Sequence, residues 1–510
     1  MPDGQRGGAG HPGHSEPEVA AAAKMNDDNA PRLWGIDEDE LRKLGHELVD
    51  LIIDRYVEPS SEVGRIASLE EASAALSSPL PWQATPLGEL VEDLRDIVGG
   101  ASLDVGHPRF LSFVPGPAHP VSVLGDLVAA GWNLHSGTWM RASGATQVEL
   151  VALEWLRQLF GMADAVGGIF LPGGSIANLT ALAVARDRCP NWQEGVVYAS
   201  DQAHSSIASA CHLVGLSPSQ LCVIPTDADY RMDVSCLQST LERNRLRGCP
   251  AIAIVANAGS TNTAAVDPLE RLAELATEHG AWLHIDAAYG GAAILSEQAR
   301  NLFRGIERAD SVTVDPHKWW FQAYECSVLL SRPELLEASF ATRPEYLAAI
   351  DGAGWGPNLC DRGPQLTRSA RAVKFWLSVR ASGLSAFSAA VAHGMELAEA
   401  VERRLGSMPN WEVVTAAQLG VITCAPRPRA GLDADGATEA IARAVNDTGA
   451  AHVATTVLKG RKAIRLCTIN PATTEDDITE VLVALDHALA SITQDDSPPG
   501  VLVPDDNGVG

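Results

Sequence analysis

Apolar and polar positions follow two different periods along the chain, and the change between them outlines the fold. Over residues 37–57 apolar side chains recur at helical spacing, from Leu41 to Ile52, and Asp37 is a suitable N-cap for the helix this predicts. A second helix is predicted over about 148–160. Short apolar runs then alternate with helical ones, at 168–171, 196–199, 251–256, 282–286 and 311–314. This rhythm predicts an α/β domain with a largely parallel buried sheet.

The pattern changes after Gly383. A long helix is expected near 385–405, followed by strand-like segments at 411–414, 420–424 and 463–468 and a last helix near 475–491. These elements predict a smaller α+β domain. Residues 1–31 and 494–510 are rich in small, acidic and proline residues without periodicity, and we expect both ends to be disordered.

Composition excludes several classes of protein. The chain has 510 residues, 46% hydrophobic and 20% charged, which is enough for a large core. Because 64 acidic residues outweigh 38 basic ones, the net charge of -26 disfavours nucleic acid and anionic membrane surfaces as partners. No apolar run approaches the roughly 18 residues of a membrane helix. Nine scattered cysteines without metal spacing predict free thiols and a cytoplasmic protein.

Lys318 is the first candidate for chemistry. The alternating run 311–314 ends in a proline-stiffened turn that carries this amine between His317 and two tryptophans. An amine at the end of a buried strand loses part of its hydration, which lowers its pKa and suits it to condensing with an aldehyde. The alternative is an ordinary surface lysine.

Two further strand ends carry polar groups. The turn at 172–175 follows an apolar strand and precedes a helix, so Gly174 and Ser175 either form a phosphate cradle at a helix start or are an ordinary turn. Asp286 closes the run 282–286, where a buried carboxylate needs a cation or a donor; otherwise it caps the next helix.

His204 and Thr261 also follow apolar runs. The imidazole could stack on a planar ring or cap a helix, and the hydroxyl could contact a ligand or belong to a plain turn. Along the chain these candidates come in the order phosphate turn, imidazole, hydroxyl, carboxylate and amine. Asp286 and Lys318 are 32 positions apart, which is enough for one crossover connection between two strands. Pyridoxal 5′-phosphate needs these groups for its aldehyde, its pyridine nitrogen and its phosphate.

The motifs closely resemble those of the group II pyridoxal-phosphate decarboxylases, in particular the aromatic-L-amino-acid decarboxylase branch. Similar blocks are Asp-Gln-Ala-His-Ser-Ser at 201–206, His-Ile-Asp-Ala-Ala-Tyr at 284–289 and Pro-His-Lys-Trp at 316–319. The resemblance covers about 34–490. It implies fold type I, with a large, mostly parallel seven-stranded sheet domain at 116–385 and a small C-terminal α+β domain at 386–493. It also implies an N-terminal helical segment at 32–115 that wraps a partner subunit in a homodimer with shared active sites.

The resemblance also implies roles by position. Lys318 would bind the cofactor aldehyde, Asp286 would pair with the pyridinium and His204 would stack on the ring. The other cofactor contacts would be Gly174, Ser175, Thr261, Ala288 and His317. Asp315 departs from the family, because an asparagine is common there in animal enzymes and an anion beside a phosphate is unfavourable.

The substrate side departs further. Relatives that take aromatic substrates usually carry more aromatic residues, and a threonine, where Val114 and Gly116 stand. We therefore expect an altered pocket that includes Phe113, Val114 and Pro115, and that accepts an aromatic or a branched aliphatic L-amino acid. Arg371 could contact the substrate or anchor a loop.

The family's mobile loop corresponds to about 341–366 and generally carries a tyrosine that protonates the substrate carbon. This chain has no tyrosine beyond Tyr346, and Arg362 stands near the expected place. We expect decarboxylation to an amine and CO2. The alternatives are oxidative deamination to an aldehyde, an aminotransferase with Arg465 as a carboxylate clamp, and a cofactor-free interaction module.

Overall fold

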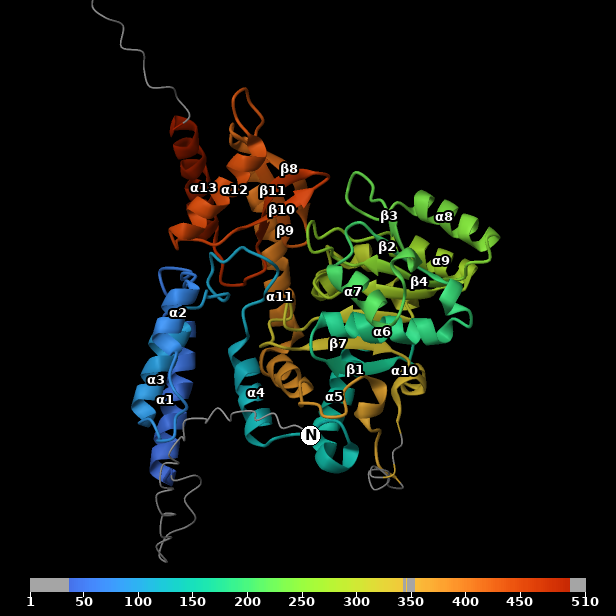
Figure 1. The fold of residues 1–510 in the computed structure, drawn as a ribbon, viewed down its shortest axis with the longest axis horizontal. Helices are drawn as coiled ribbons and strands as arrows, with labels where there is room; N and C mark the ends of the chain where they lie inside the picture. The colour runs from blue at the N-terminus through green and yellow to red at the C-terminus, as the bar shows by residue number, and fades with distance from the viewer. Residues whose placement is uncertain (1–35, 343–344, 346–353, 496–510) are drawn as a thin grey trace, which may run out of the picture.

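The computed structural model describes residues 36–342, 345 and 354–495. Three helices come first, α1 (Glu38–Val57), α2 (Leu69–Leu76) and α3 (Leu87–Glu92), and a π-helical turn (Asp93–Gly99) follows them. Asp37 caps α1 as predicted, accepting a bond of 2.8 Å from the Glu40 N–H. In Figure 1 these helices form a blue column at the side of the molecule. No residue of α1 or α2 is buried, so this segment has an unpartnered surface.

A seven-stranded sheet forms the centre of the large domain. Its order is β1 (Gly167–Leu171), β7 (Ser327–Ser331), β6 (Ser311–Val314), β5 (Trp282–Asp286), β4 (Ala251–Asn257), β2 (Val196–Ser200) and β3 (Leu221–Ile224). Only β7 runs antiparallel to its two neighbours. The mostly parallel sheet is therefore confirmed. The five apolar runs are all strands, whereas β3 and β7 were not predicted.

Helices cover both faces of the sheet. Alternate side chains of the strands point to opposite faces, so each strand contributes to two cores. One core packs beneath α6 (Gly174–Arg188), α7 (Ser205–Leu213) and α10 (Pro333–Phe340). The other lies against α5 (Trp139–Leu159), α8 (Val234–Leu246) and α9 (Leu269–His279). Burial on both faces explains why the strands read as continuous apolar runs. The predicted helix over 148–160 is the second half of α5.

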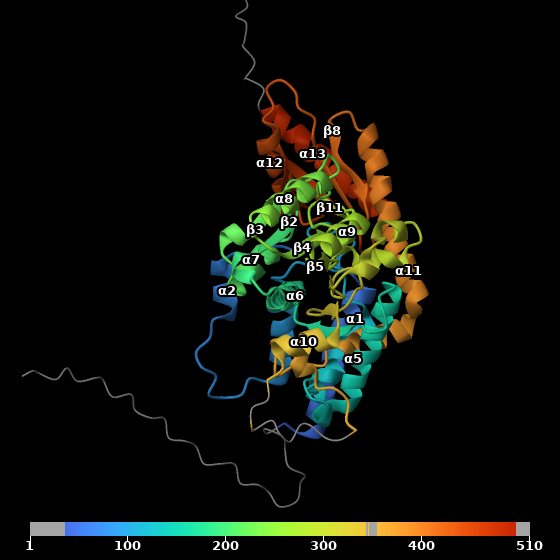
Figure 2. The same cartoon turned by 90° about the vertical axis from the view of Figure 1, so that its right-hand side faces the viewer.

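The small domain lies at one end of the molecule, orange to red in Figures 1 and 2. Its antiparallel sheet has the order β10 (Ala454–Leu458), β11 (Arg461–Cys467), β9 (Val421–Pro426) and β8 (Trp411–Gln418), with α12 (Ala434–Asp447) and α13 (Glu475–Asp495) packed against it. Strand β10 was missed, because exposed side chains interrupt its pattern. Helix α13 continues to Asp495; the rest of the predicted disordered ends lies outside the described residues.

Helix α11 (Ala372–Ser407) joins the two domains and begins 13 residues before the predicted start near 385. Gly383 interrupts it with φ of 73°, a conformation that glycine adopts at little cost, so the change of pattern at this residue marks a break within the helix. Among the described residues, α11 is the one helix long and apolar enough to cross a membrane. It packs on α4 (Pro120–Gly131), α5 and β8 inside the fold.

Candidate active site

Lys318 lies in the turn that follows β6. Its backbone N–H bonds the Asp315 carbonyl oxygen at 2.9 Å, and the side chains of Trp319 and Trp320 are buried in the core. The Lys318 Nζ lies 2.9 Å from Asp315 Oδ2. Burial lowers the pKa of this amine, but the carboxylates of Asp315 and then Asp286 raise it by more, so the net pKa is above the ordinary value. The predicted lowering of the pKa is therefore wrong, because the two carboxylates stabilise the charged amine.

The carboxylate of Asp315 is held by two side chains. Its Oδ1 accepts a 2.6 Å bond from the Ser327 hydroxyl, and its Oδ2 faces the Lys318 amine. Burial raises the pKa of this carboxyl, yet the cations of Lys318 and His317 outweigh burial and lower it. The carboxylate also lies against Gly174, where an added Cβ would be 2.6 Å from Oδ2. The anion beside the predicted phosphate cradle is thus balanced by the catalytic lysine candidate.

Asp286 ends β5 and is fixed by Asn178. The Asn178 Nδ2 donates to Asp286 Oδ2 at 2.9 Å, and the Ala288 N–H donates to Oδ1 at 3.1 Å. The Asn178 Oδ1 lies 3.0 Å from Nε2 of His284, and the Nδ1 of His284 lies 2.8 Å from the Ser311 hydroxyl. The carboxylate is therefore the end of a buried chain of hydrogen bonds.

The chain of hydrogen bonds that ends at Asp286 has one consistent set of proton positions. Burial lowers the pKa of His284 to about 4, so the ring is neutral. Because Asn178 gives its N–H to Asp286, its carbonyl oxygen accepts from Nε2–H of His284, and Nδ1 accepts from the Ser311 hydroxyl. Sequence reasoning missed Asn178 and His284. His284 could have been found, since it lies two residues before Asp286 and alternate strand residues share a face.

The turn before α6 has the features of an anion site. Gly173 has φ of 94°, which favours glycine, and it stands at the N-cap without a side-chain cap. Among the described residues, the N–H groups of Gly174 and Ser175 have no hydrogen-bond acceptor. A helix start with unpaired N–H groups attracts an anion.

His204 and Thr261 lie where the sequence pattern predicted, after strands β2 and β4. His204 caps α7, since its Nδ1 accepts from the Ser206 N–H at 3.2 Å, and the residue is exposed. The Ser206 hydroxyl also accepts from Asn178 at 2.9 Å, which ties this cap to the Asp286 network. Thr261 offers its carbonyl oxygen to Arg465 at 2.9 Å. Capping does not preclude ring stacking, and the cofactor roles of both residues stay predictions.

In the segment 113–117, Gly116 lies against the lysine turn. Phe113 is 58% exposed with φ of 55°, while Val114 is buried in the core of the large domain. A Cβ added to Gly116 would overlap the Lys318 carbonyl oxygen, so only glycine fits there without movement. Phe113 is thus available to a ligand, whereas Val114 acts on the pocket through packing.

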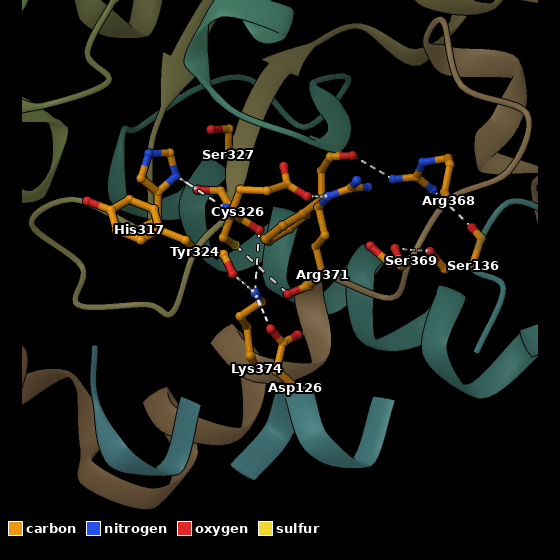
Figure 3. A network of polar contacts seen from close by, with 12 residues as sticks. Asp126, Ser136, His317, Tyr324, Cys326, Ser327, Arg368, Ser369, Arg371 and Lys374 are labelled. Atoms are coloured by element: carbon orange, nitrogen blue, oxygen red, sulfur yellow. Dashed lines mark hydrogen bonds and ion pairs between the residues drawn. The ribbon is translucent and has the colours of Figure 1, made fainter. Parts of the chain in front are cut away.

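The arginines of the sequence hypothesis are engaged with protein groups. Arg371 is buried and its Nε donates to Glu325 Oε1 at 2.8 Å, which favours anchoring of the lysine turn (Figure 3). Arg362 is also buried and pairs with Glu337 at 2.9 Å. Arg465 of the small domain donates to the Thr261 carbonyl oxygen of the large domain at 2.9 Å. Tyr346 lies outside the described residues.

Comparison with known proteins identifies the family of this site. Residues 70–425 match the model described as "Pyridoxal-dependent decarboxylase conserved domain". The chain belongs to this family. It is a pyridoxal-phosphate-dependent amino acid decarboxylase, as the sequence motifs predicted.

Individual relatives of this decarboxylase cover nearly its whole length. It is 39% identical to an aromatic-L-amino-acid decarboxylase of Bacillus atrophaeus, over 88% of this chain and 95% of the relative. It is 27% identical to a phenylacetaldehyde synthase of Arabidopsis thaliana, over 89% and 97%. A crystal structure of Oryza sativa TDC with PLP and tryptamine superimposes with a TM-score of 0.85 and 28% identity, covering 90% and 99%. The expected fold type I architecture agrees with this likeness.

The decarboxylase carries side chains that fit its cofactor. Pyridoxal 5′-phosphate needs an amine, a carboxylate and an anion site, and these are Lys318, the Asn178-bound Asp286 and the unpaired N–H groups of Gly174 and Ser175. Asp315 alone is unfavourable to a phosphate, and its ion pair with Lys318 reduces that repulsion.

Asp315→Asn is expected to shift cofactor loading to lower pH. Only the unprotonated amine attacks an aldehyde, and in the wild type the raised pKa of Lys318 keeps it charged until the pH rises well above neutral. Removing the Asp315 charge removes the largest raising influence, so the pKa of Lys318 falls relative to the wild type and the loading rate at neutral pH increases. The measurement is the rate at which cofactor absorbance develops in apoprotein across a pH series. Ser327→Ala, which keeps the charge, is the control, and an unshifted Asp315→Asn profile would contradict the expectation.

Gly116→Thr is expected to weaken cofactor binding. The new side chain must displace the Lys318 carbonyl, and overpacking of this kind costs about 1–3 kcal/mol, or roughly tenfold to a hundredfold in the dissociation constant. Titration of apoprotein with cofactor measures the change. Gly131→Thr is the matched control because an added Cβ there meets nothing within 4 Å. Equal affinities for the two variants would show that the lysine turn tolerates the shift.

Proposed function

We propose that this enzyme converts an aromatic L-amino acid into the corresponding amine and CO2. The observation that carries the proposal is the contact of Gly116 with the Lys318 carbonyl oxygen, together with exposed Phe113 three residues earlier, which offers an aromatic surface to a ligand. The name of the Bacillus relative, an aromatic-L-amino-acid decarboxylase, supports the same substrate class.

Each residue has a part in this reaction. Bound pyridoxal 5′-phosphate supplies a ring that accepts the electron pair left when the substrate loses its carboxylate. Lys318 would hold the cofactor through its amine, and Asp286, steadied by Asn178, would keep the ring nitrogen protonated. The start of α6 would bind the phosphate through Gly174 and Ser175. His204, Thr261 and Ala288 would contact the ring, and His317 supports the lysine turn through the Cys326 carbonyl at 2.6 Å.

The second candidate product is an aldehyde. Phenylacetaldehyde synthase is the name of one relative, and the predicted loop segment carries buried Arg362, paired with Glu337, near the place where a tyrosine was expected. An aminotransferase is disfavoured, since the matching family model and the Bacillus relative are decarboxylases, and Arg465 already donates one bond to the Thr261 carbonyl.

The test is a parallel assay of CO2, amine, aldehyde and peroxide from purified enzyme supplied with each of the twenty amino acids. We expect equal amounts of amine and CO2 from an aromatic amino acid. Stoichiometric peroxide with little amine would show that the product is the aldehyde. Turnover of branched aliphatic amino acids alone would show that the substrate is not aromatic.

The active unit is proposed to be a homodimer built on α1–α3. These helices and the segments between them expose large apolar side chains, among them Leu69 (86%), Leu80 (77%) and Trp82 (82%), and a second copy of the chain would cover them. Light scattering after gel filtration should give twice the mass of 53.9 kDa. A monomeric wild type would overturn the dimer. The free thiols of all nine cysteines support a reducing compartment such as the cytoplasm.

A further inference from the structure

Tyr324 stands in the turn between Lys318 and β7. The hydroxyls of Tyr198 and Tyr289 are engaged: Asn244 donates to that of Tyr198 at 2.9 Å, and the Gly420 N–H donates to that of Tyr289 at 3.2 Å. Tyr324 is 59% exposed, and its hydroxyl has no hydrogen-bond partner among the described residues. Its phenol is therefore available to a ligand.

The backbone of Tyr324 is fixed by a buried lysine from another part of the chain. Lys374 Nζ donates to the carbonyl oxygens of Ala323, Tyr324 and Glu325 at 3.1, 3.3 and 3.4 Å, and to Asp126 Oδ2 at 2.7 Å (Figure 3). Its side chain is only 2% exposed. Three carbonyls bound to one ammonium hold the turn rigidly, which is the condition for placing a phenol with accuracy.

The phenol ring lies beside the catalytic lysine turn. It packs on the His317 ring at 5.2 Å between centroids, with 49° between the planes, and His317 is itself held by Cys326 (Figure 3). Burial raises the pKa of Tyr324, and the nearby Lys318 ammonium lowers it by less. The group therefore stays protonated at neutral pH and interacts electrostatically with the amine that holds the cofactor, so it is an acid in the right neighbourhood.

We propose that Tyr324 donates the proton that replaces the departing carboxylate, a step that rests on the proposed amine-forming function. The bond between the α-carbon and the carboxylate breaks, CO2 leaves, and the electron pair stays with the substrate. The O–H bond of Tyr324 then breaks as its proton bonds to that carbon. Water returns a proton to the phenolate, which its exposure permits. No oxidant takes part, and the product is the amine.

This role supplies the acid that the predicted loop lacks. No tyrosine follows Tyr346 in the chain, and Arg362, near the expected place, is a permanent cation that cannot donate a proton at neutral pH. A phenol in the lysine turn protonates the carbon without a contribution from that loop. Rapid protonation also leaves less time for dioxygen to divert the reaction to aldehyde.

Tyr324→Phe in the holoenzyme tests the proposal, because it removes one hydroxyl and keeps the ring on His317. In air, the ratio of amine to CO2 is expected to fall while aldehyde and peroxide appear. Without oxygen, the steady-state rate of amine formation is expected to fall by roughly 10²–10⁴-fold, the usual contribution of a positioned acid. The CO2 released in a single turnover is expected to be unchanged, since the carboxylate leaves before the proton arrives.

Two readouts separate this role from a structural one. The cofactor content from visible absorbance and the thermal midpoint of Tyr324→Phe should match the wild type. Tyr346→Phe is the matched control and should keep the wild-type ratio of amine to CO2. A normal ratio in Tyr324→Phe, or an altered ratio in Tyr346→Phe alone, would overturn the proposal while the amine function stands. A wild type that itself makes aldehyde and peroxide would overturn the amine function, and this role with it.

Discussion

Lys318→Ala is expected to abolish covalent attachment of pyridoxal 5′-phosphate and to slow decarboxylation by at least roughly 10²–10⁴-fold. The variant loses the amine proposed to condense with the cofactor, and an amine in this place is also expected to transfer protons, for which a single positioned group is worth about that factor. Asp286, Asn178 and the start of α6 remain, so weak non-covalent binding should persist.

The decisive measurement is borohydride reduction followed by peptide mapping. In the wild type we expect the label on the peptide that contains position 318, and in Lys318→Ala no label there. Lys462→Ala is the matched control, because that lysine pairs with Glu439 on the surface of the small domain. A wild type whose label falls on another lysine would refute the assignment of Lys318.

The strand ends could be predicted because their signal is local. Each apolar run was bounded by the turn that carries its polar residue, so alternation and position made Lys318 and Asp286 candidates, and the family resemblance gave them their expected roles. The start of α6 was equally visible, since two glycines stand between a strand and a helical pattern. The structure added Asn178, whose partner Asp286 is 108 residues away. No spacing rule within one sequence connects such residues.

Elements held by distant partners could not be predicted. Helix α11 starts at Ala372, earlier than its apolar pattern suggests, because the buried charge of Lys374 interrupts that pattern. The ammonium is tolerated there since it binds Asp126 and three carbonyl oxygens of the lysine turn. Likewise β7 pairs antiparallel with β1 and β6, and a five-residue strand directly after a long turn carries no mark of that pairing. Tertiary contacts decided both cases.

Arg368→Ala is expected to destabilise the enzyme by about 3–5 kcal/mol, the usual effect of leaving a buried charge unpaired. Neither Arg368 nor Glu149 exposes any side-chain surface, and their ion pair measures 2.6 Å. The pair also fixes β1, since Glu149 accepts from the Phe170 N–H at 2.8 Å and Arg368 donates to the Phe170 carbonyl at 2.7 Å. Because β1 leads into the turn that holds Gly174, the loss should reach the cofactor site.

The double variant Glu149→Gln with Arg368→Met separates charge from packing. Glutamine keeps an acceptor for the Phe170 N–H, methionine fills the space of the arginine stem, and no unpaired charge remains. Denaturant unfolding with bound cofactor, followed by both fluorescence and cofactor absorbance, should place its midpoint between those of Arg368→Ala and the wild type. If the double variant is as unstable as Arg368→Ala, the buried charge is not the cause. The hydrogen bonds of the guanidinium to Ser136 and Phe170 would then be what holds β1 in place.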